Sequence, residues 1–198
     1  MIPRVLHQVW LGNHPPHPRL VSFMDSVKQY HPGWEYHLWA ESNIGSLGLD
    51  MHTLMARCVG VVSAADVIRC QAVFVWGGIY LDIDVECLKS LEPLRQYPAF
   101  AAKQQDGRVC NAFFGAEPGH PWIRWQLDRL LDPHTRIIPP MGVLTMTEAP
   151  RQDGNPVLLD THLVYPFNWD TPPDQCHPHP DSLVVHHWEK SWGPHYSP

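Results

Sequence analysis

The chain has 198 residues, of which 44% are hydrophobic and 17% are charged, so it can bury one sizeable core and is too apolar for a disordered chain. Lys and Arg number 14 against 20 Asp and Glu, and this net charge of −6 comes with no basic run that would bind a nucleic-acid backbone. The apolar stretch 72–81 is interrupted by two glycines and is too short to cross a bilayer, and the first residues lack the pattern of a signal peptide; we therefore expect a cytoplasmic protein with no transmembrane segment and no nucleic-acid partner.

The first part of the chain predicts a strand, a helix and a second strand. Residues 2–11 alternate branched and aromatic side chains and end at Gly12, which indicates a buried strand followed by a turn. Apolar residues recur with helical spacing from Leu20 to Tyr30, and residues 31–33 (His-Pro-Gly) end this helix before a strand at 34–39.

The middle of the chain predicts a long helix that leads into a short buried strand. Residues 50–58 can form a short helix, and Ser63 can cap a longer one over 64–76, which the pair Gly77-Gly78 ends. Residues 79–81 then form an apolar strand that runs directly into Asp82-Ile83-Asp84. Open α/β sheets bind ligands at such strand ends.

The remaining elements keep the α/β order. We expect strands at 99–102 and 112–115, a helix at 121–131, a strand near 162–165 inside the proline-rich stretch 139–180, and a last strand at 183–187. Many of the 14 histidines lie in proline-rich segments, which favours solvated loops, so we assign them no role as a group. We see no internal repeat, and we expect residues 1–198 to form a single domain of the α/β class.

The pair Asp82 and Asp84 is the strongest chemical signal in the sequence. In an extended segment the two carboxylates would project to the same side, and a hard divalent cation would relieve their repulsion and bind the oxygens of a diphosphate. Taken alone, most Asp-x-Asp triplets are solvated loop acids or helix caps. The surrounding sequence decides between the two readings.

That surrounding sequence resembles glycosyltransferase family 32. The similarity covers the helix with Ser63, Asp66 and Arg69, the strand after Gly77-Gly78, and the Asp-x-Asp loop, over residues 63–86. The same stretch is similar to the catalytic domains of large clostridial glucosylating toxins. Further matches are the opening strand at residues 2–10, a less specific segment at 111–121, and the closing His-His-x-x-x-Ser-Trp pattern at 186–192.

The resemblance implies a GT-A fold, that is, a nucleotide-binding α/β/α sandwich with a mixed central sheet. It also implies a retaining, metal-dependent glycosyltransferase, which moves a hexose from a UDP- or GDP-sugar to a hydroxyl of a glycan, lipid, natural product or protein, with Mn²⁺ or Mg²⁺ as cofactor. The alternative from another class is a degenerate module that binds nucleotide sugars without turnover. A histidine-based metallohydrolase is a poorer rival, because an H-E-x-x-H motif is absent.

Residue roles follow from the resemblance position by position. Asp84 matches the direct metal ligand and Asp82 the residue that meets the ribose and metal-bound water, while Asp66 and Arg69 match contacts to the donor sugar. The remaining matched positions are Val9 and Trp10 at the donor base, Asn111 near the sugar or acceptor, Ser191 and Trp192 in a loop that closes over the diphosphate, and His186 or His187 at the metal or phosphate.

Several of these positions have a purely structural reading. A strand tryptophan such as Trp10 is usually part of the core. Asp66 and Arg69 at i, i+3 could be an ordinary ion pair, with Asp66 closing a capping box from Ser63. Adjacent strand residues point in opposite directions, so we expect only one of the two histidines at the metal and favour His187.

Overall fold

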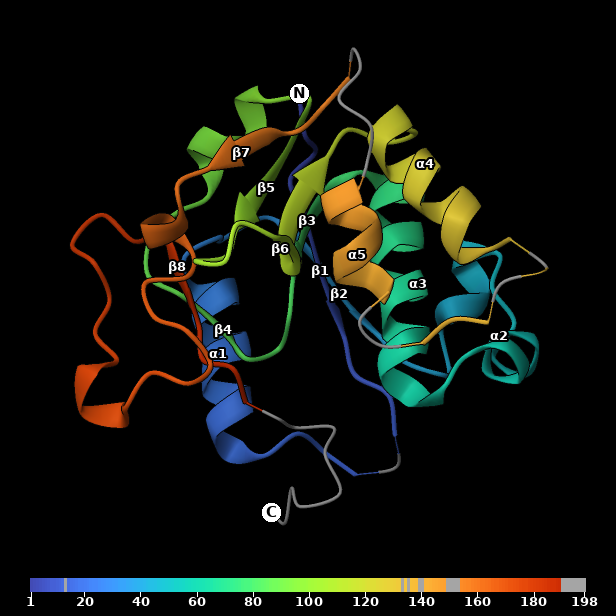
Figure 1. The fold of residues 1–198 in the computed structure, drawn as a ribbon, viewed down its shortest axis with the longest axis horizontal. Coiled ribbons are helices and arrows are strands. Elements are labelled where there is room, and N and C mark those ends of the chain that lie inside the picture. The colour runs from blue at the N-terminus through green and yellow to red at the C-terminus, as the bar shows by residue number, and fades with distance from the viewer. Residues whose placement is uncertain (13, 133, 135, 139–140, 149–153, 190–198) are drawn as a thin grey trace.

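The structure, a computed structural model, describes residues 1–12, 14–132, 134, 136–138, 141–148 and 154–189 (Figure 1). Its strands are β1 (Val5–Val9), β2 (Glu35–Trp39), β3 (Gly78–Leu81), β4 (Val85–Cys87), β5 (Ala99–Lys103), β6 (Val109–Ala116), β7 (Val157–Leu159) and β8 (Val184–His186). Its α-helices are α1 (Pro18–Gln29), α2 (Met51–Arg57), α3 (Gly60–Trp76), α4 (Pro121–Leu130) and α5 (Met141–Glu148). Short 3₁₀ turns are η1 (Ile44–Leu47), η2 (Glu92–Gln96), η3 (Thr161–Leu163) and η4 (Pro173–Gln175).

A mixed six-stranded sheet with the order β2-β1-β3-β6-β5-β7 forms the centre of the molecule. Strands β2, β1 and β3 are parallel, whereas β6 is antiparallel to both β3 and β5. Because β1 and β3 are parallel neighbours, the residues that follow both strands emerge at the same edge of the sheet. Trp10 follows β1 and Asp82 follows β3, so the sheet brings these two predicted site residues to one edge.

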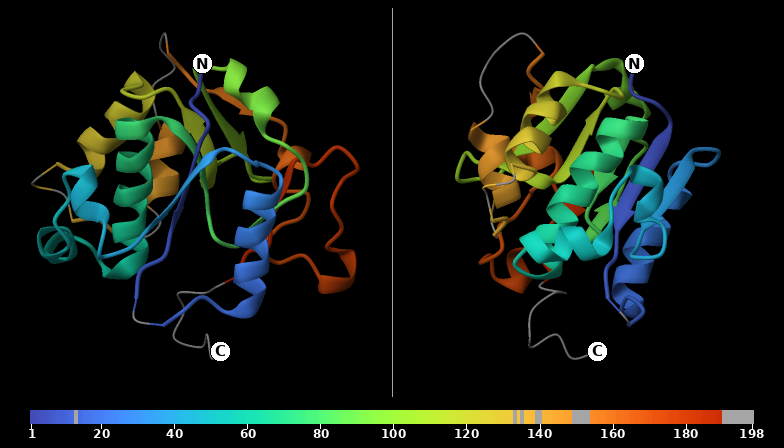
Figure 2. Two further views of the ribbon diagram at one scale, coloured as in Figure 1. Left: turned by 180° about the vertical axis from the view of Figure 1, so that it is seen from behind. Right: turned by 90° about the vertical axis from the view of Figure 1, so that its right-hand side faces the viewer.

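The two faces of the sheet are covered differently. Helices α3, α4 and α5 group on one side, whereas α1 lies apart beside the small antiparallel sheet of β4 and β8 (Figures 1 and 2). Side chains of β3 and β6 alternate between the two cores: Tyr80 and Phe114 pack under the helices, and Ile79, Leu81 and Phe113 pack on the other side. The expected α/β/α sandwich with a mixed sheet is confirmed, with β4 and β8 forming part of the second cover.

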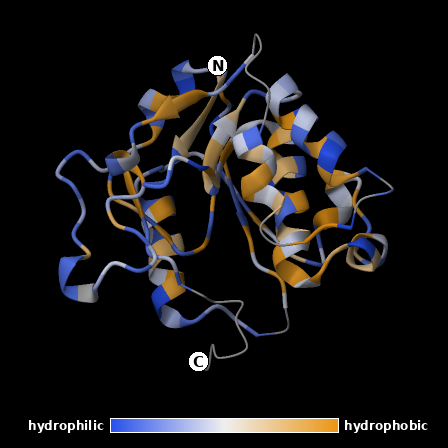
Figure 3. Ribbon diagram, viewed as in Figure 1, coloured by the Kyte–Doolittle hydropathy of each residue, from blue (hydrophilic) through white to orange (hydrophobic). Residues whose placement is uncertain are grey.

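Hydropathy follows this arrangement. Figure 3 shows hydrophobic residues along the central strands, while the segment that carries η4 is largely hydrophilic. No helix among the described residues is long and apolar enough to cross a membrane.

Two glycines allow α3 to turn directly into β3. Gly77 adopts φ 62° and donates its N–H to Val73 at the end of the helix, and Gly78 follows with φ 102°. A Cβ atom at Gly78 would lie 2.5 Å from the carbonyl oxygen of Val5 on β1, so only glycine permits this close approach of the two chains.

Some sequence expectations fail on local detail. Helix α3 begins at Gly60, so Ser63 is inside it, with its hydroxyl donating to the carbonyl of Val59 rather than capping the helix. The strand expected at 162–165 is the turn η3, and β7 and α5 were not expected. Propensity alone did not indicate α5 because its eight residues include a glycine, a valine and two threonines, which are weak helix formers.

Candidate active site

The Asp-x-Asp segment is a tight turn between β3 and β4. The Val85 N–H donates to the carbonyl of Asp82 at 3.0 Å, while the Asp82 N–H donates to Ala112 on β6 at 2.8 Å. The carbonyl of Asp82 also accepts a 3.2 Å bond from the side-chain amide of Gln8 on β1. The expectation of an extended segment is therefore wrong, but the turn itself brings the carboxylates of Asp82 and Asp84 within 4.8 Å of each other.

Asp82 faces α3. Its Oδ1 lies 2.9 Å from Nη1 of Arg69 and accepts a 2.6 Å hydrogen bond from the hydroxyl of Tyr80. The Arg69 guanidinium also donates to the carbonyl of Asn111 at 2.9 Å and lies 4.8 Å from the centre of the Tyr80 ring. Burial alone would lower the pKa of Arg69. The electrostatic effects of Asp82, Tyr80 and Asp66 are larger, so the pKa of Arg69 lies above its ordinary value.

Asp66 lies beneath this group and is buried. It accepts hydrogen bonds from Nδ2 of Asn111 at 2.6 Å and from the N–H of Gly142 on α5 at 3.2 Å, and it lies 3.5 Å from Nη2 of Arg69. Burial raises the pKa of Asp66, and Arg69 offsets only part of this effect. The carboxylate of Asp66 is thus bonded to Asn111 and Gly142, and the hydroxyl of Ser63 donates to Val59, so the two residues do not form the expected capping box.

Asp84 faces the opposite way, toward β8. Its Oδ1 lies 3.3 Å from Nε2 of His186, and its Oδ2 accepts the N–H of Glu189 at 2.9 Å. Burial opposes ionisation, but attraction and hydrogen bonding from His186 and the Glu189 N–H outweigh it, so the pKa of Asp84 lies below its ordinary value. In return, Asp84 overcomes the effect of burial on His186 and raises its pKa.

The structure corrects the choice between the two adjacent histidines. His186 reaches the aspartate pair, whereas Nε2 of His187 lies 2.8 Å from Glu86 on β4 and its ring stacks on Phe23 at 4.2 Å. The alternation of side chains along β8 separates the two rings, as expected. However, the register of β8 against β4 pairs His186 with Val85, which directs His186 rather than His187 toward the turn.

The expected base-binding residues lie at the end of β1. Val9 is buried, and Trp10 is half-buried, with its ring against a small core that includes Leu20 and Ile83 and its Nε1 donating to the carbonyl of His14 at 2.7 Å. Trp10 thus packs against the small core that also contains Ile83, the central residue of the Asp-x-Asp turn. Ser191 and Trp192 lie outside the described residues.

Asp82, Asp84 and His186 together can hold a metal ion. Each offers one ligand atom, and the three atoms lie within 4.8 Å of one another. The other ring nitrogen of buried His186, Nδ1, has no hydrogen-bond partner among the described residues, so nothing there competes for the orientation of this imidazole. Two carboxylates and one imidazole are a donor set that suits divalent cations such as Mn²⁺.

Three supporting residues escaped the sequence analysis. Tyr80 donates a hydrogen bond to Asp82, and the N–H of Gly142 donates one to Asp66. Gln8 donates to the backbone of the turn and accepts a hydrogen bond from Tyr36 at 2.7 Å. A Cβ at Gly142 would lie 2.2 Å from Nδ2 of Asn111, so the approach of α5 depends on this glycine. Tyr80 could have been found from its i, i+2 spacing to Asp82, but the other two contacts depend on tertiary packing.

Comparison with known proteins identifies glycosyltransferases as relatives of this chain. The family model described as "Glycosyltransferase sugar-binding region containing DXD motif" matches residues 18–101. Inositol phosphoceramide mannosyltransferase 3 of Schizosaccharomyces pombe is 32% identical over 126 residues, which are 62% of this chain and 35% of that protein. The uncharacterized glycosyltransferase L373 of Acanthamoeba polyphaga mimivirus is 21% identical over 98% of this chain and 85% of its own length. The chain thus spans about a third of the yeast relative.

Two solved structures share the architecture. Galactosyltransferase LgtC, solved with donor and acceptor sugar analogs, superposes with a TM-score of 0.58 over 96% of this chain and 90% of LgtC, at 13% identity. The PaToxG glycosyltransferase gives a TM-score of 0.55 over 73% of this chain and 69% of its own, also at 13% identity. At such low identity the likeness concerns the fold. The resemblance to the DXD-containing glycosyltransferases of family 32 is therefore confirmed, and the fold is that of the GT-A glycosyltransferases.

Proposed function

We propose that this chain is a retaining, metal-dependent glycosyltransferase, which moves a hexose from a nucleotide-diphosphate sugar to a hydroxyl acceptor. The observation that carries the proposal is the convergence of Asp82, Asp84 and His186 at the sheet edge where Trp10 also emerges. Because the relative from Schizosaccharomyces pombe is named a mannosyltransferase acting on a phosphoceramide, a GDP-mannose donor and a lipid acceptor are the first combination to test.

Each residue has a role in this proposal. Asp84, Asp82 and His186 hold Mn²⁺ or Mg²⁺, which when bound would stabilise the negative charge of the departing diphosphate. Arg69 and Tyr80 fix the carboxylate of Asp82 through its Oδ1. Trp10 and Val9 position the base of the donor, and Ser191 with Trp192 exclude water from the bound diphosphate.

The sugar-binding roles of Asp66, Arg69 and Asn111 carry a structural condition. Asp66 and Arg69 are buried, and the N–H of Gly142 occupies an oxygen of Asp66. A sugar could therefore reach Asp66 only if α5 shifts. Because the Asp66 oxygens already accept two hydrogen bonds, this carboxylate is a poor nucleophile, which supports front-face attack on the donor by the acceptor hydroxyl.

The test is a screen of UDP- and GDP-sugars with and without Mn²⁺, which measures both thermal shift and release of nucleotide diphosphate. We expect one donor to stabilise the protein only with the cation and to be turned over slowly without acceptor. Metal-dependent binding without any turnover, also in the presence of lipid and glycan acceptors, would identify the chain as a binding module. Binding that is insensitive to metal removal would overturn the metal site.

A further inference from the structure

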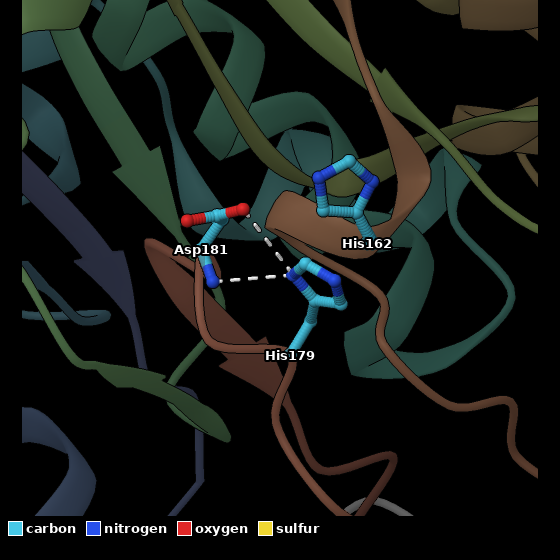
Figure 4. Close-up of side chains that lie close together, drawn as sticks. All are labelled: His162, His179 and Asp181. Atoms are coloured by element: carbon cyan, nitrogen blue, oxygen red, sulfur yellow. Dashed lines mark hydrogen bonds and ion pairs between the residues drawn. The ribbon is translucent and has the colours of Figure 1, made fainter.

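A second group of metal-binding side chains lies at the surface, away from the Asp-x-Asp turn. His162 on η3 meets His179 and Asp181, which come from the end of the proline-rich segment before β8 (Figure 4). One ligand atom from each lies within 4.8 Å of the others. The two rings are 4.6 Å apart and tilted by 59°, and Nδ1 of His179 lies 3.7 Å from a carboxylate oxygen of Asp181.

A buried serine holds the backbone of this group in place. The hydroxyl of Ser182 donates to the carbonyl of His162 at 2.6 Å and accepts the N–H of His179 at 3.1 Å. The N–H of Leu183 donates to the carbonyl of Leu163 at 2.9 Å and joins the same two segments, while the N–H of Ser182 donates to the carbonyl of His179 at 2.9 Å within the second segment. Both histidines are therefore brought together by the fold itself, so a ligand would not have to order these segments.

We propose that His162, His179 and Asp181 form a binding site for Zn²⁺ or a similar borderline transition-metal cation. Two imidazoles and one carboxylate with open positions for water are a typical zinc donor set, whereas the carboxylate-rich group at Asp82 and Asp84 suits harder cations. In a tetrahedral zinc site with bonds of about 2.1 Å, ligand atoms are about 3.4 Å apart, so these side chains need to close by about an ångström. Rotation of surface side chains provides this movement.

Zinc binding replaces one existing hydrogen bond with a bond to the metal. Nδ1 of His179 accepts the N–H of Asp181 at 3.1 Å, and a cation at this nitrogen replaces that bond, leaving the amide to water. The bound cation cross-links η3 to the segment that leads into β8. Because β8 carries His186, the cross-link would fix the strand that contributes to the candidate active site.

The test measures zinc binding to the intact chain by equilibrium dialysis in the presence of excess Mn²⁺. We expect one tight Zn²⁺ per chain, and we expect His179→Ala and Asp181→Asn each to weaken it by at least about tenfold. The matched control is His177→Ala, which removes an exposed histidine two residues away in the same segment. His177→Ala and Asp84→Asn should both bind the cation as the wild type does.

A spectroscopic measurement gives a second readout. Co²⁺ in the same site should show the intense visible absorption of a tetrahedral complex with nitrogen ligands, and His162→Ala should remove it. The proposal is overturned if zinc affinity is unchanged in His179→Ala, if His177→Ala weakens it equally, or if Asp84→Asn abolishes the tight binding. The substitutions lie at surface side chains, and a thermal melt of each variant without metal verifies that it is folded.

Discussion

The two aspartates of the turn differ in the groups that face them. Asp82 contacts Arg69, whose charge is permanent, and the hydroxyl of Tyr80, so its side chain is held on the α3 side at every physiological pH. Asp84 contacts His186, which can lose its proton and become a metal ligand. Asp82 is thus held by a permanent cation, whereas Asp84 can exchange its contact with His186 for a contact with a metal ion.

The largest effect is expected from Asp84→Asn. Loss of a charged ligand should reduce transfer by about a thousandfold or more and remove the stabilisation that Mn²⁺ and nucleotide diphosphate give together. The measurements are steady-state turnover and the thermal shift with both ligands. Glu86→Gln is the matched control, because Glu86 on β4 is the next acid along the chain and contacts His187 instead.

The structure also changes the expected stability of this variant without metal. Repulsion between two carboxylates would predict that the variant gains stability. Because Asp84 pairs with His186 and accepts the Glu189 N–H, we expect a loss, measured by urea unfolding. A wild-type thermal shift with metal and nucleotide in Asp84→Asn would show that Asp84 is not the ligand.

Arg69→Ala tests the other side of the comparison. Without Arg69, buried Asp66 and the adjacent Asp82 lose their cation, and we expect the free energy of unfolding to fall by about 3–5 kcal/mol. Urea unfolding measures this, and Arg69→Met combined with Asp66→Asn should recover much of the loss, because it removes the uncompensated buried charge. If the double variant is as unstable as Arg69→Ala, packing and not charge explains the effect.

The sequence predicted the α3 side of the site better than the β8 side. Asp66, Arg69 and Asp82 lie within one helix-to-strand unit, so their proximity follows from local periodicity and the resemblance. His186 reaches Asp84 across a hundred residues through the register between β4 and β8, which no local pattern encodes. The choice of His187 failed for this reason.

At the Asp-x-Asp turn, the sequence analysis predicted the proximity of the two carboxylates correctly but from an incorrect local structure. Alternation along an extended strand predicted that the carboxylates of Asp82 and Asp84 would be near each other, and they are near each other because the chain turns. Gly142 shows the opposite limit, since its contact with Asp66 depends on the packing of a helix that the sequence did not predict. The sequence thus identified which residues carry the chemical groups of the site, but the contacts between these residues depend on long-range packing.

A pH measurement compares two buried histidines. Asp84 raises the pKa of His186, whereas burial lowers the pKa of His7 to about 4, and the bond between Nε2 of His7 and the carbonyl of Gly77 offsets only part of this effect. In the unfolded chain His7 titrates near 6.5. The contribution of neutral His7 to the free energy of unfolding is therefore full above pH about 6.5. As the pH falls to about 4, this free energy decreases by about 3 kcal/mol. Urea unfolding at several pH values should give a shallower acid slope for His7→Gln; an unchanged slope would assign the acid loss to other groups such as His31.

Gly142→Ala tests how closely α5 covers Asp66. The added Cβ would lie 2.2 Å from Asn111 Nδ2 and 2.6 Å from Asp66 Cγ, so we expect a loss of about 1–3 kcal/mol as α5 moves outward. Gly45→Ala is the matched control, because nothing lies within 4 Å of a Cβ there. If a sugar must displace α5, the same variant should bind nucleotide sugar relatively better than nucleotide diphosphate, which calorimetry on both ligands measures. Equal stability of the two variants would mean that α5 does not pack as described.

The smallest effect is expected from Trp10→Ala. A base stacked on the indole would lose a contact worth about 1–3 kcal/mol, so donor affinity should weaken by about tenfold while Mn²⁺ binding stays unchanged. Trp10→Phe keeps an aromatic face and loses only the hydrogen bond to the carbonyl of His14, so it should retain most of the affinity. A structural role predicts another pattern, because Trp10 packs against the small core that contains Ile83, and Ile83 lies between the two aspartates. In that case both variants would lower the melting temperature, and metal binding would weaken together with nucleotide binding. Titration calorimetry with Mn²⁺ alone and with nucleotide diphosphate separates the two roles, and an unchanged nucleotide affinity in Trp10→Ala would remove this residue from the donor site.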